Sequence, residues 1–239
     1  MGLRVVQVNL KARDDVALGR FWAAALGWVA RSGGHGATSA APAGFVWTEP
    51  GAPVVVDVIA VPDPATVEAR AHLELATTSR AHHAELVTSL RELGATPAEG
   101  QGTVLADPEG NVFCVREPQE WDGGPIAAVV VDCADPQAMA RFWGEALDWT
   151  VHEASGGHTV LRAAGGPGLE FVRTPHLRTT RHRAHLDVVP SHGGDQAAQV
   201  ARLRERGATL VDVGQGPDVS WTVLADPEGN AFCVLAPGP

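Results

Sequence analysis

The nonapeptide Thr-Val-Leu-Ala-Asp-Pro-Glu-Gly-Asn occurs twice in the chain, at residues 103–111 and again at residues 222–230. Chance does not supply a match of this length, and each copy is followed by Phe-Cys-Val, at residues 113–115 and 232–234. Asp-Pro-Glu-Gly is also a turn signature, because proline presets φ at the second position and glycine is free to adopt φ > 0. We therefore interpret each copy as a hairpin between two strands rather than as a pair of catalytic acids.

The repeat extends beyond the nonapeptide. Arg20-Phe-Trp matches Arg141-Phe-Trp, and His72-Leu-Glu-Leu matches His185-Leu-Asp-Val, in the same order along the chain. The 239 residues therefore form two homologous halves, each close to the common size of a domain.

A stretch rich in glycine, proline and acidic residues separates the two halves, and this composition is typical of a linker. We predict a first domain over residues 1–118, a linker over residues 119–124 and a second domain over residues 125–239.

Each half has the pattern of a strand, a helix and then short strands, twice over. Residues 5–10 alternate between apolar and polar side chains, which is typical of a strand. Asp14 and Gly27 are suited to begin and end the helix that follows. In the second half Asp135 and Pro136 begin the corresponding helix. The unit is βαβββ, used four times, which predicts an α+β fold.

The charge and composition exclude several classes of partner. The chain carries 28 acidic and 18 basic residues, a net charge of −10, which would repel a phosphate backbone. We expect neither nucleic acid nor an anionic membrane as a partner. No stretch approaches the ~18–20 apolar residues of a membrane span, and three dispersed cysteines do not make a disulfide scaffold. We expect a soluble, cytoplasmic protein with reduced thiols.

The paired βαβββ unit, the Phe-Trp pair followed by Leu-Gly-Trp at residues 26–28, and the Asp-Pro-x-Gly-Asn hairpin together resemble the vicinal oxygen chelate superfamily. This superfamily contains glyoxalase I, bleomycin resistance proteins, extradiol dioxygenases and fosfomycin resistance enzymes. The resemblance is strongest to glyoxalase-like domain proteins and covers essentially the whole chain, once per half. It implies a tandem repeat of four βαβββ modules, in which each half is a curled, mainly antiparallel sheet with helices on its convex face.

Members of the superfamily that catalyse reactions hold a divalent metal ion on the concave face of the sheet. The resemblance places the ligand positions of the first half at Gln7, Asp57, His72 and Cys114. It places those of the second half at Ala128, Glu170, His185 and Cys233. Neither set is the family's usual His or Gln, Glu, His and Glu, and Ala128 cannot ligate an ion. The first half could still hold one divalent ion (zinc, nickel, manganese or iron), because imidazole and thiolate suit zinc. The alternative is that the cysteines are small buried apolar residues and that no metal is bound.

Strand alternation assigns further side chains to the concave faces. The residues that we expect to contact a small molecule are Asn9, Trp47, Val130, Glu170, His185, Asp187 and Trp221. The side chains that we expect to move protons, if the chain is an enzyme, are Glu74, Glu170 and His185. The alternative is that His72 and His185 are structural, hydrogen-bonded to acids on neighbouring strands. Two Ser-Gly-Gly-His segments, which end at His35 and His158, predict tight turns with exposed imidazoles.

An apolar concavity with a few polar groups is typical of a small-molecule site. We therefore expect a small-molecule binding protein of the glyoxalase and bleomycin resistance type, which sequesters a metabolite or an antibiotic in the concave pocket. The alternative is a metal-dependent lyase, epimerase or transferase that uses the first half. A dioxygenase is disfavoured, because each half lacks the second histidine of a two-His-one-carboxylate iron site. Two copies in one chain predict a monomer with an internal pseudo-dimer, or a homodimer.

Overall fold

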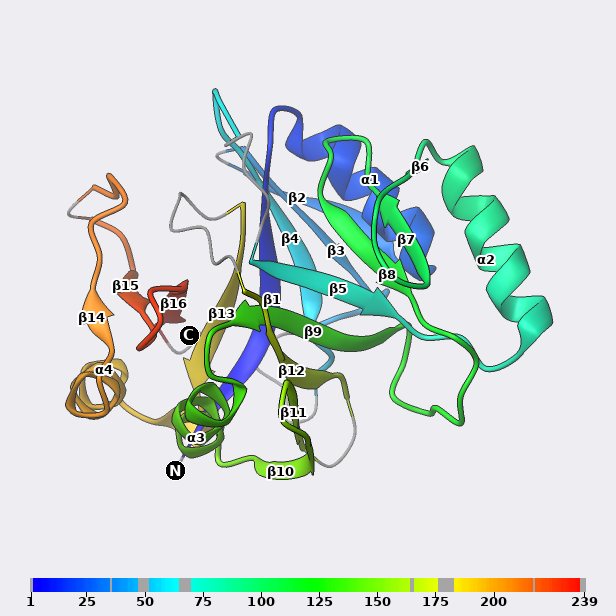
Figure 1. Cartoon of the computed structure of the whole chain (residues 1–239). Coiled ribbons are helices and arrows are strands. Elements are labelled where there is room, and N and C mark those ends of the chain that lie inside the picture. Colours follow the sequence, from blue (N-terminus) through cyan, green and yellow to red (C-terminus); the bar gives the residue numbers. More distant parts are fainter. Residues whose placement is uncertain are drawn as a thin grey trace.

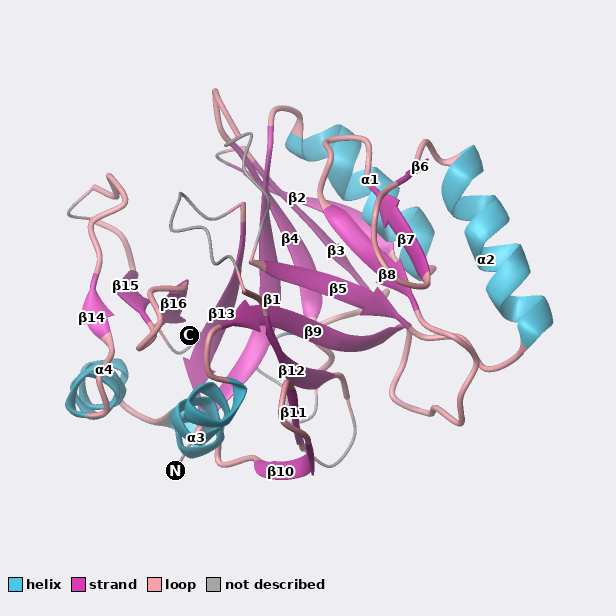
Figure 2. Cartoon of the chain, in the orientation of Figure 1, coloured by secondary structure: helices cyan, strands magenta, loops and turns pink. Residues whose placement is uncertain are grey.

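The structure is a computed structural model that describes residues 2–34, 36–46, 52–64, 70–163, 166–175, 183–216 and 218–236. Its helices and strands repeat as four βαβββ modules, which we number in chain order (Figures 1 and 2). The predicted α+β fold with four modules is therefore confirmed.

Modules 1 and 2 make up the first half. Module 1 contains β1 (Leu3–Ala12), α1 (Asp15–Leu26), β2 (Val29–Gly34), β3 (Ala37–Ala41) and β4 (Val55–Ala60). Module 2 contains β5 (Ala71–Leu75), α2 (Arg80–Glu92), β6 (Thr96–Pro97), β7 (Thr103–Ala106) and β8 (Val112–Val115).

Modules 3 and 4 make up the second half. Module 3 contains β9 (Ile126–Cys133), α3 (Pro136–Leu147), β10 (Thr150–Ala154), β11 (His158–Arg162) and β12 (Gly168–Arg173). Module 4 contains β13 (Ala184–Pro190), a short 3₁₀ helix (Ser191–Gly193), α4 (Gln196–Glu205), β14 (Thr209–Leu210), β15 (Trp221–Ala225) and β16 (Ala231–Leu235).

The strands form two open, mixed sheets of eight strands, and each sheet combines one module from each half. Sheet A has the order β14-β15-β16-β13-β1-β4-β3-β2, so it joins module 4 to module 1. Sheet B has the order β10-β11-β12-β9-β5-β8-β7-β6, so it joins module 3 to module 2. In Figure 1 the blue strand β1 accordingly lies beside the yellow β13, while the cyan β5 lies beside the green β9.

This pairing corrects the expectation that each half forms a sheet of its own. The first strand of every module presents a free edge to the next module in its sheet, and β1 and β5 both meet their partners in antiparallel register across that edge. Because the two halves repeat the same modules, the edges offered by modules 2 and 4 are equivalent. The sequence pattern alone does not distinguish pairing within a half from pairing between halves.

The side-chain core, by contrast, connects the two modules of one half. In the first half the ring of Trp22 on α1 lies 5.1 Å from that of Phe113 on β8, so a helix over sheet A packs against a strand of sheet B. In the second half Trp143 on α3 lies 4.9 Å from Phe232 on β16 in the same way. Both tryptophans are almost fully buried and belong to the hydrophobic core. The modules are thus linked within each half by aromatic packing and between halves by strand pairing.

The repeated nonapeptide forms the hairpin that was predicted, and its aspartate organises the turn. Asp107 Oδ1 accepts hydrogen bonds from the backbone amides of Glu109, at 3.0 Å, and of Asn111, at 2.9 Å. Asp107 Oδ2 accepts from Asn111 Nδ2, at 2.8 Å, and from the indole of Trp22, at 3.1 Å. Glu109 then accepts from the amides of Arg13 and Asp14, at the start of α1. The repeat is therefore a structural clamp between a hairpin and a helix, with no free acid for catalysis.

The helix ends also follow the sequence. Asp14 accepts a hydrogen bond from the amide of Ala17, and Asp135 accepts from those of Gln137 and Ala138, as expected of N-caps. Across the described part of the chain, no helix is long and apolar enough to cross a membrane.

Candidate functional site

Two clusters of polar side chains lie in the middle of the two sheets, one in each. They alternate along their strands with core residues such as Val8, Leu186 and Phe113, so they lie on the sheet face that the helices do not cover. Site A, in sheet A, consists of Gln7, Asn9, Ser39, Asp57, His185, Asp187 and Cys233. Site B, in sheet B, consists of His72, Glu74, Cys114, Arg116, His158 and Glu170.

Site A is assembled from both halves of the chain. Gln7 faces Asp187 across the β1–β13 pair and donates to its Oδ2 from Nε2, at 2.8 Å. His185 Nε2 lies 3.2 Å from Asp187 Oδ1 and 3.5 Å from Cys233 Sγ. On the other side of β1, Asp57 accepts hydrogen bonds from Asn9 Nδ2, at 3.5 Å, and from the hydroxyl of Ser39.

Burial disfavours the ionised forms of two groups in site A, the carboxyl of Asp57 and the thiol of Cys233. The pKa of Asp57 is raised to about 6, chiefly by burial and further by the charge of Asp187, while the Ser39 hydrogen bond and His185 act in the opposite direction. Burial also raises the pKa of the Cys233 thiol far above its usual range, and the neighbouring Asp187 adds to this effect. Apart from the imidazole of His185, the titratable groups of site A are therefore acids and a thiol, and no arginine is among its members.

The donor set of site A suits a divalent metal ion. Ligand atoms of His185, Asp187 and Cys233 all lie within 4.8 Å of one another. Asn9 Oδ1 is buried and accepts no hydrogen bond, although a buried oxygen normally has a partner. The buried Asp187 Oδ1 has His185 Nε2 as its neighbour, at 3.2 Å. Imidazole, carboxylate and thiolate together are the ligands of zinc sites. His185, Asp187 and Cys233 would hold such an ion, with Gln7 and Asp57 beside them.

Site B has similar residues but a different arrangement, because an arginine lies among its acids. Arg116 forms an ion pair through Nε with Glu74 Oε2 and a second one through Nη2 with Glu170 Oε1, the latter at 2.5 Å. The other oxygen of Glu170 lies 3.0 Å from His158 Nε2. His72, Glu74 and Cys114 also have ligand atoms within 4.8 Å of one another.

The electrostatics of site B follow from this arginine. Burial opposes the charge of Arg116, but Glu170 and Glu74 outweigh burial and raise its pKa. Burial lowers the pKa of His72, against the pull of Glu74, and raises that of Cys114 to about 11. Near neutral pH the site thus contains a charged arginine between two carboxylates, beside a protonated thiol.

The structure does not bring together the four metal positions predicted for the first half. Gln7 and Asp57 lie in sheet A, whereas His72 and Cys114 lie in sheet B. The exchange of modules between the sheets is the physical reason. The positions regroup as Gln7, Asp57, His185 and Cys233 in site A, and as Ala128, Glu170, His72 and Cys114 in site B.

The residues predicted to contact a ligand or move protons are divided in the same way. Asn9, His185 and Asp187 belong to site A, whereas Val130, Glu170 and Glu74 lie in sheet B. Both of these glutamates are paired with Arg116.

Of the two tryptophans predicted to contact a ligand, Trp221 belongs to the described part of the chain and is not a member of either cluster. Trp221 faces Leu235, two residues beyond Cys233, so it shares the face of site A, and it is 40% exposed. Trp47 lies outside the described residues.

Three residues of the two sites were missed by reasoning from the sequence. Ser39 faces Asp57 across the β3–β4 pair, and Arg116 comes two residues after Cys114. Strand alternation would therefore have assigned Arg116 to the same face as Cys114. His158 was expected to be exposed in a turn but instead begins β11 and contacts Glu170. His35 lies outside the described residues.

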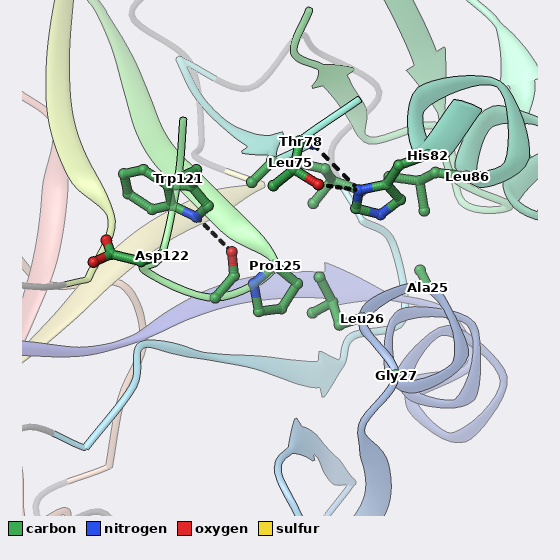
Figure 3. A pocket seen from close by; sticks show the side chains of 12 residues that line it. Ala25, Leu26, Gly27, Leu75, Thr78, His82, Leu86, Trp121, Asp122 and Pro125 are labelled. Carbon is green, nitrogen blue, oxygen red and sulfur yellow. Dashed lines mark hydrogen bonds between the residues drawn. The ribbon is translucent and has the colours of Figure 1, made fainter. Parts of the chain in front are cut away.

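A separate cavity of about 440 Å³ opens between the end of α1, the start of α2 and the linker (Figure 3). Two of its polar side chains are already paired, because Trp121 Nε1 donates to the carbonyl of Gly124 and His82 Nδ1 contacts Thr78 (Figure 3). The remaining wall is largely apolar, with Leu26, Leu75 and Leu86 among its residues. This cavity offers volume without the convergent free polar groups that sites A and B possess.

Comparison with known proteins agrees with the fold described above. The family model for the glyoxalase-like domain matches residues 7–116 and again residues 128–235. The chain therefore belongs to the glyoxalase-like domain family, and the predicted membership of the vicinal oxygen chelate superfamily is confirmed.

Two solved structures of tandem form share the whole architecture. Glyoxalase I from Zea mays has a TM-score of 0.70 and 14% sequence identity, covering 99% of this chain and 93% of its own. A provisionally assigned dioxygenase from Bacillus subtilis has a TM-score of 0.61 and 14% identity, covering 100% of this chain and 86% of its own. At these identities the likeness concerns the fold alone. A search of curated protein sequences gives no match.

Proposed function

We propose that site A binds a divalent metal ion, zinc foremost, and through it a small oxygen-bearing molecule. The observation that carries this proposal is the cluster of His185, Asp187 and Cys233, whose ligand atoms all lie within 4.8 Å of one another. The proposal moves the metal from the first half, where the sequence placed it, to a site that both halves build.

Small-molecule binding is the function that this site supports best. A bound divalent ion polarises an oxygen atom of its ligand. The amide of Gln7 and the hydroxyl of Ser39 flank the cluster as donors to Asp187 and Asp57, which holds these carboxylates in place. Trp221 is exposed on the same face of the sheet and could stack on an apolar part of the ligand. Sequestration of a metabolite or an antibiotic is the simplest use of such a site.

One observation favours a second candidate, a metal-dependent lyase, epimerase or transferase. The pKa of Asp57 is raised to about 6, close to the pH at which a general base or acid works best. Asp57 lies beside the cluster, so it could move a proton on a molecule held there. In this proposal Glu74 and Glu170 take no part in the chemistry, because Arg116 neutralises both.

The experiment that tests the metal site uses the internal repeat as its control. We expect about one equivalent of zinc per chain, measured by elemental analysis and by isothermal titration calorimetry of chelator-treated protein. His185→Ala should abolish this binding, whereas His72→Ala, at the equivalent position of site B, should retain it. Equal loss in both variants, or no binding of Zn²⁺, Ni²⁺, Mn²⁺ or Fe²⁺ by the unaltered protein, would contradict the proposal.

The small molecule is then sought with the metal-loaded protein. Tryptophan fluorescence reports on Trp221, and Trp221→Phe provides the control for that signal. Turnover is tested with Asp57→Asn, which keeps the shape and the Ser39 hydrogen bond but cannot ionise. Loss of turnover with retained metal would support catalysis, whereas binding without turnover would support sequestration.

We propose further that the full chain is a monomer with an internal pseudo-dimer, because both sheets are completed within one chain. We also propose domains at residues 1–118 and 125–239, and a cytoplasmic location. The three cysteines are free thiols, which supports a reducing compartment. Sedimentation of the full chain as a dimer would contradict the first of these proposals.

A further inference from the structure

We propose that Arg116 serves as a built-in cation that occupies the place of the metal ion in site B, and that site B is a metal site masked by this arginine. Its guanidinium contacts Glu74 through Nε and Glu170 through Nη2. The proposal concerns a site that the proposed function does not use.

The register of the strands shows that Arg116 lies between the counterparts of two site A acids. Glu74 faces Ala128 across the β5–β9 pair, as Asp187 faces Gln7 across the β1–β13 pair. Glu74 is therefore the counterpart of Asp187.

The second acid is placed by the parallel pairs. Glu170 lies beside Val130 on β9, as Asp57 lies beside Asn9 on β1. Glu170 is therefore the counterpart of Asp57. The guanidinium thus joins Glu74, the counterpart of the candidate ligand Asp187, to Glu170, the counterpart of the neighbouring Asp57.

Two differences between the halves explain why the arginine fits in one site only. Ala128 stands where site A has Gln7, so the middle of site B carries a methyl group instead of an amide side chain. Arg116 itself follows Cys114 by two residues, and the equivalent position after Cys233 is Leu235. Compared with site A, site B therefore lacks the amide that donates to the acid and gains a permanent positive charge.

The charge of the arginine excludes a divalent ion. Both Glu74 and Glu170 are engaged by the guanidinium, and His158 contacts the remaining oxygen of Glu170. An ion entering between the carboxylates would lie close to a guanidinium that stays charged at any ordinary pH. The contact with Glu170 also ties the segment that directly follows β8 of module 2 to β12 of module 3, so Arg116 links the two halves.

The test removes the arginine in a protein that lacks the site A ligand. The His185→Ala variant, which keeps Arg116, should bind no zinc ion. His185→Ala combined with Arg116→Met should gain about one equivalent of zinc, and a further Glu74→Gln change should lose it. Arg206→Met, which removes an exposed arginine paired with Glu145, is the matched control and should gain none.

Zinc stoichiometry by elemental analysis and a zinc-dependent rise in unfolding temperature are the two readouts. Circular dichroism establishes that each variant is folded, and Arg116→Gln replaces the Met variant if that one does not fold. The proposal would be overturned if the His185→Ala variant bound zinc and the double variant His72→Ala/His185→Ala did not. A folded Arg116 variant that gains no zinc would overturn it as well.

Because every comparison is made in the His185→Ala background, the outcome does not depend on whether site A binds metal. If the unaltered protein binds no metal but removal of Arg116 creates zinc binding at site B, only the proposed function is refuted. If the unaltered protein binds zinc at site A but removal of Arg116 creates no binding at site B, only the masking role of Arg116 is refuted.

Discussion

Separating the two halves tests the module exchange most directly. In residues 1–118 alone, β1 loses its partner β13 and β5 loses its partner β9. The β1–β13 pair has seven registered residue pairs and the β5–β9 pair has five, so twelve pairs are lost. At about one backbone hydrogen bond per pair and roughly 1 kcal/mol for each bond, the loss is on the order of 12 kcal/mol. That is comparable to the whole net stability of a domain, ~5–15 kcal/mol.

A folded monomeric half cannot absorb such a loss, yet it keeps the aromatic core in which Trp22 packs on Phe113. The half can recover both sets of strand pairs by pairing with a second copy of itself. In the repeat β5 is equivalent to β13, so β5 of one copy can pair with β1 of the other copy, and the reverse. We therefore expect residues 1–118 to be a dimer, or to aggregate, in sedimentation equilibrium over a wide range of concentration. Co-expression with residues 125–239 should give a one-to-one complex instead. A monomeric half with cooperative unfolding would refute the reasoning.

Three further outcomes are expected. The pKa of Asp57 is raised from 3.8 to about 6 in the folded chain. The contribution of Asp57 to the free energy of unfolding is therefore fully present below pH ~4 and is lost as pH rises through 6. Two pKa units at 1.36 kcal/mol each make this about 3 kcal/mol. Urea unfolding of metal-free protein should therefore show lower stability at pH 8 than at pH 5, with a smaller difference in Asp57→Asn; an equal difference would contradict the assignment. Asp107→Ala removes the acceptor of four hydrogen bonds, so we expect a loss of about 3 kcal/mol in chemical denaturation, matched by Asp226→Ala; a loss below about 1 kcal/mol would count against the clamp. Cys114, with a pKa raised to about 11, should alkylate at pH 8 far more slowly than a free thiol of ordinary pKa, and a rate equal to that of such a thiol would show that its environment is not as described.

Local features of the fold could be predicted because they depend on residues close together in the chain. The caps at Asp14 and Asp135, the hairpin at Asp107 and the burial of Trp22 each follow from a short pattern. The resemblance to the superfamily placed Gln7, Asp57, His185 and Cys233 on the concave face, and alternation along the strands assigned Asn9 and Asp187 to that face as well. What such patterns specify is the face of a strand on which a side chain lies.

The composition of each site could not be predicted, because it depends on which strand edges meet. Gln7 faces Asp187 at a separation of 180 residues, and nothing near either residue in sequence encodes that contact. With Gln7 and His72 in the same half, the sequence favoured a ligand set that the sheets divide between them.

The sequence by itself therefore determined the two halves, the four βαβββ modules and the polar faces of their strands, since period and repeat are local properties of the chain. Only the tertiary structure decided that module 1 pairs with module 4 and module 2 with module 3, because repeated modules present equivalent edges and the choice is made by packing. That choice gives site A a buried set of metal-ligating groups and places Arg116 between the acids of site B.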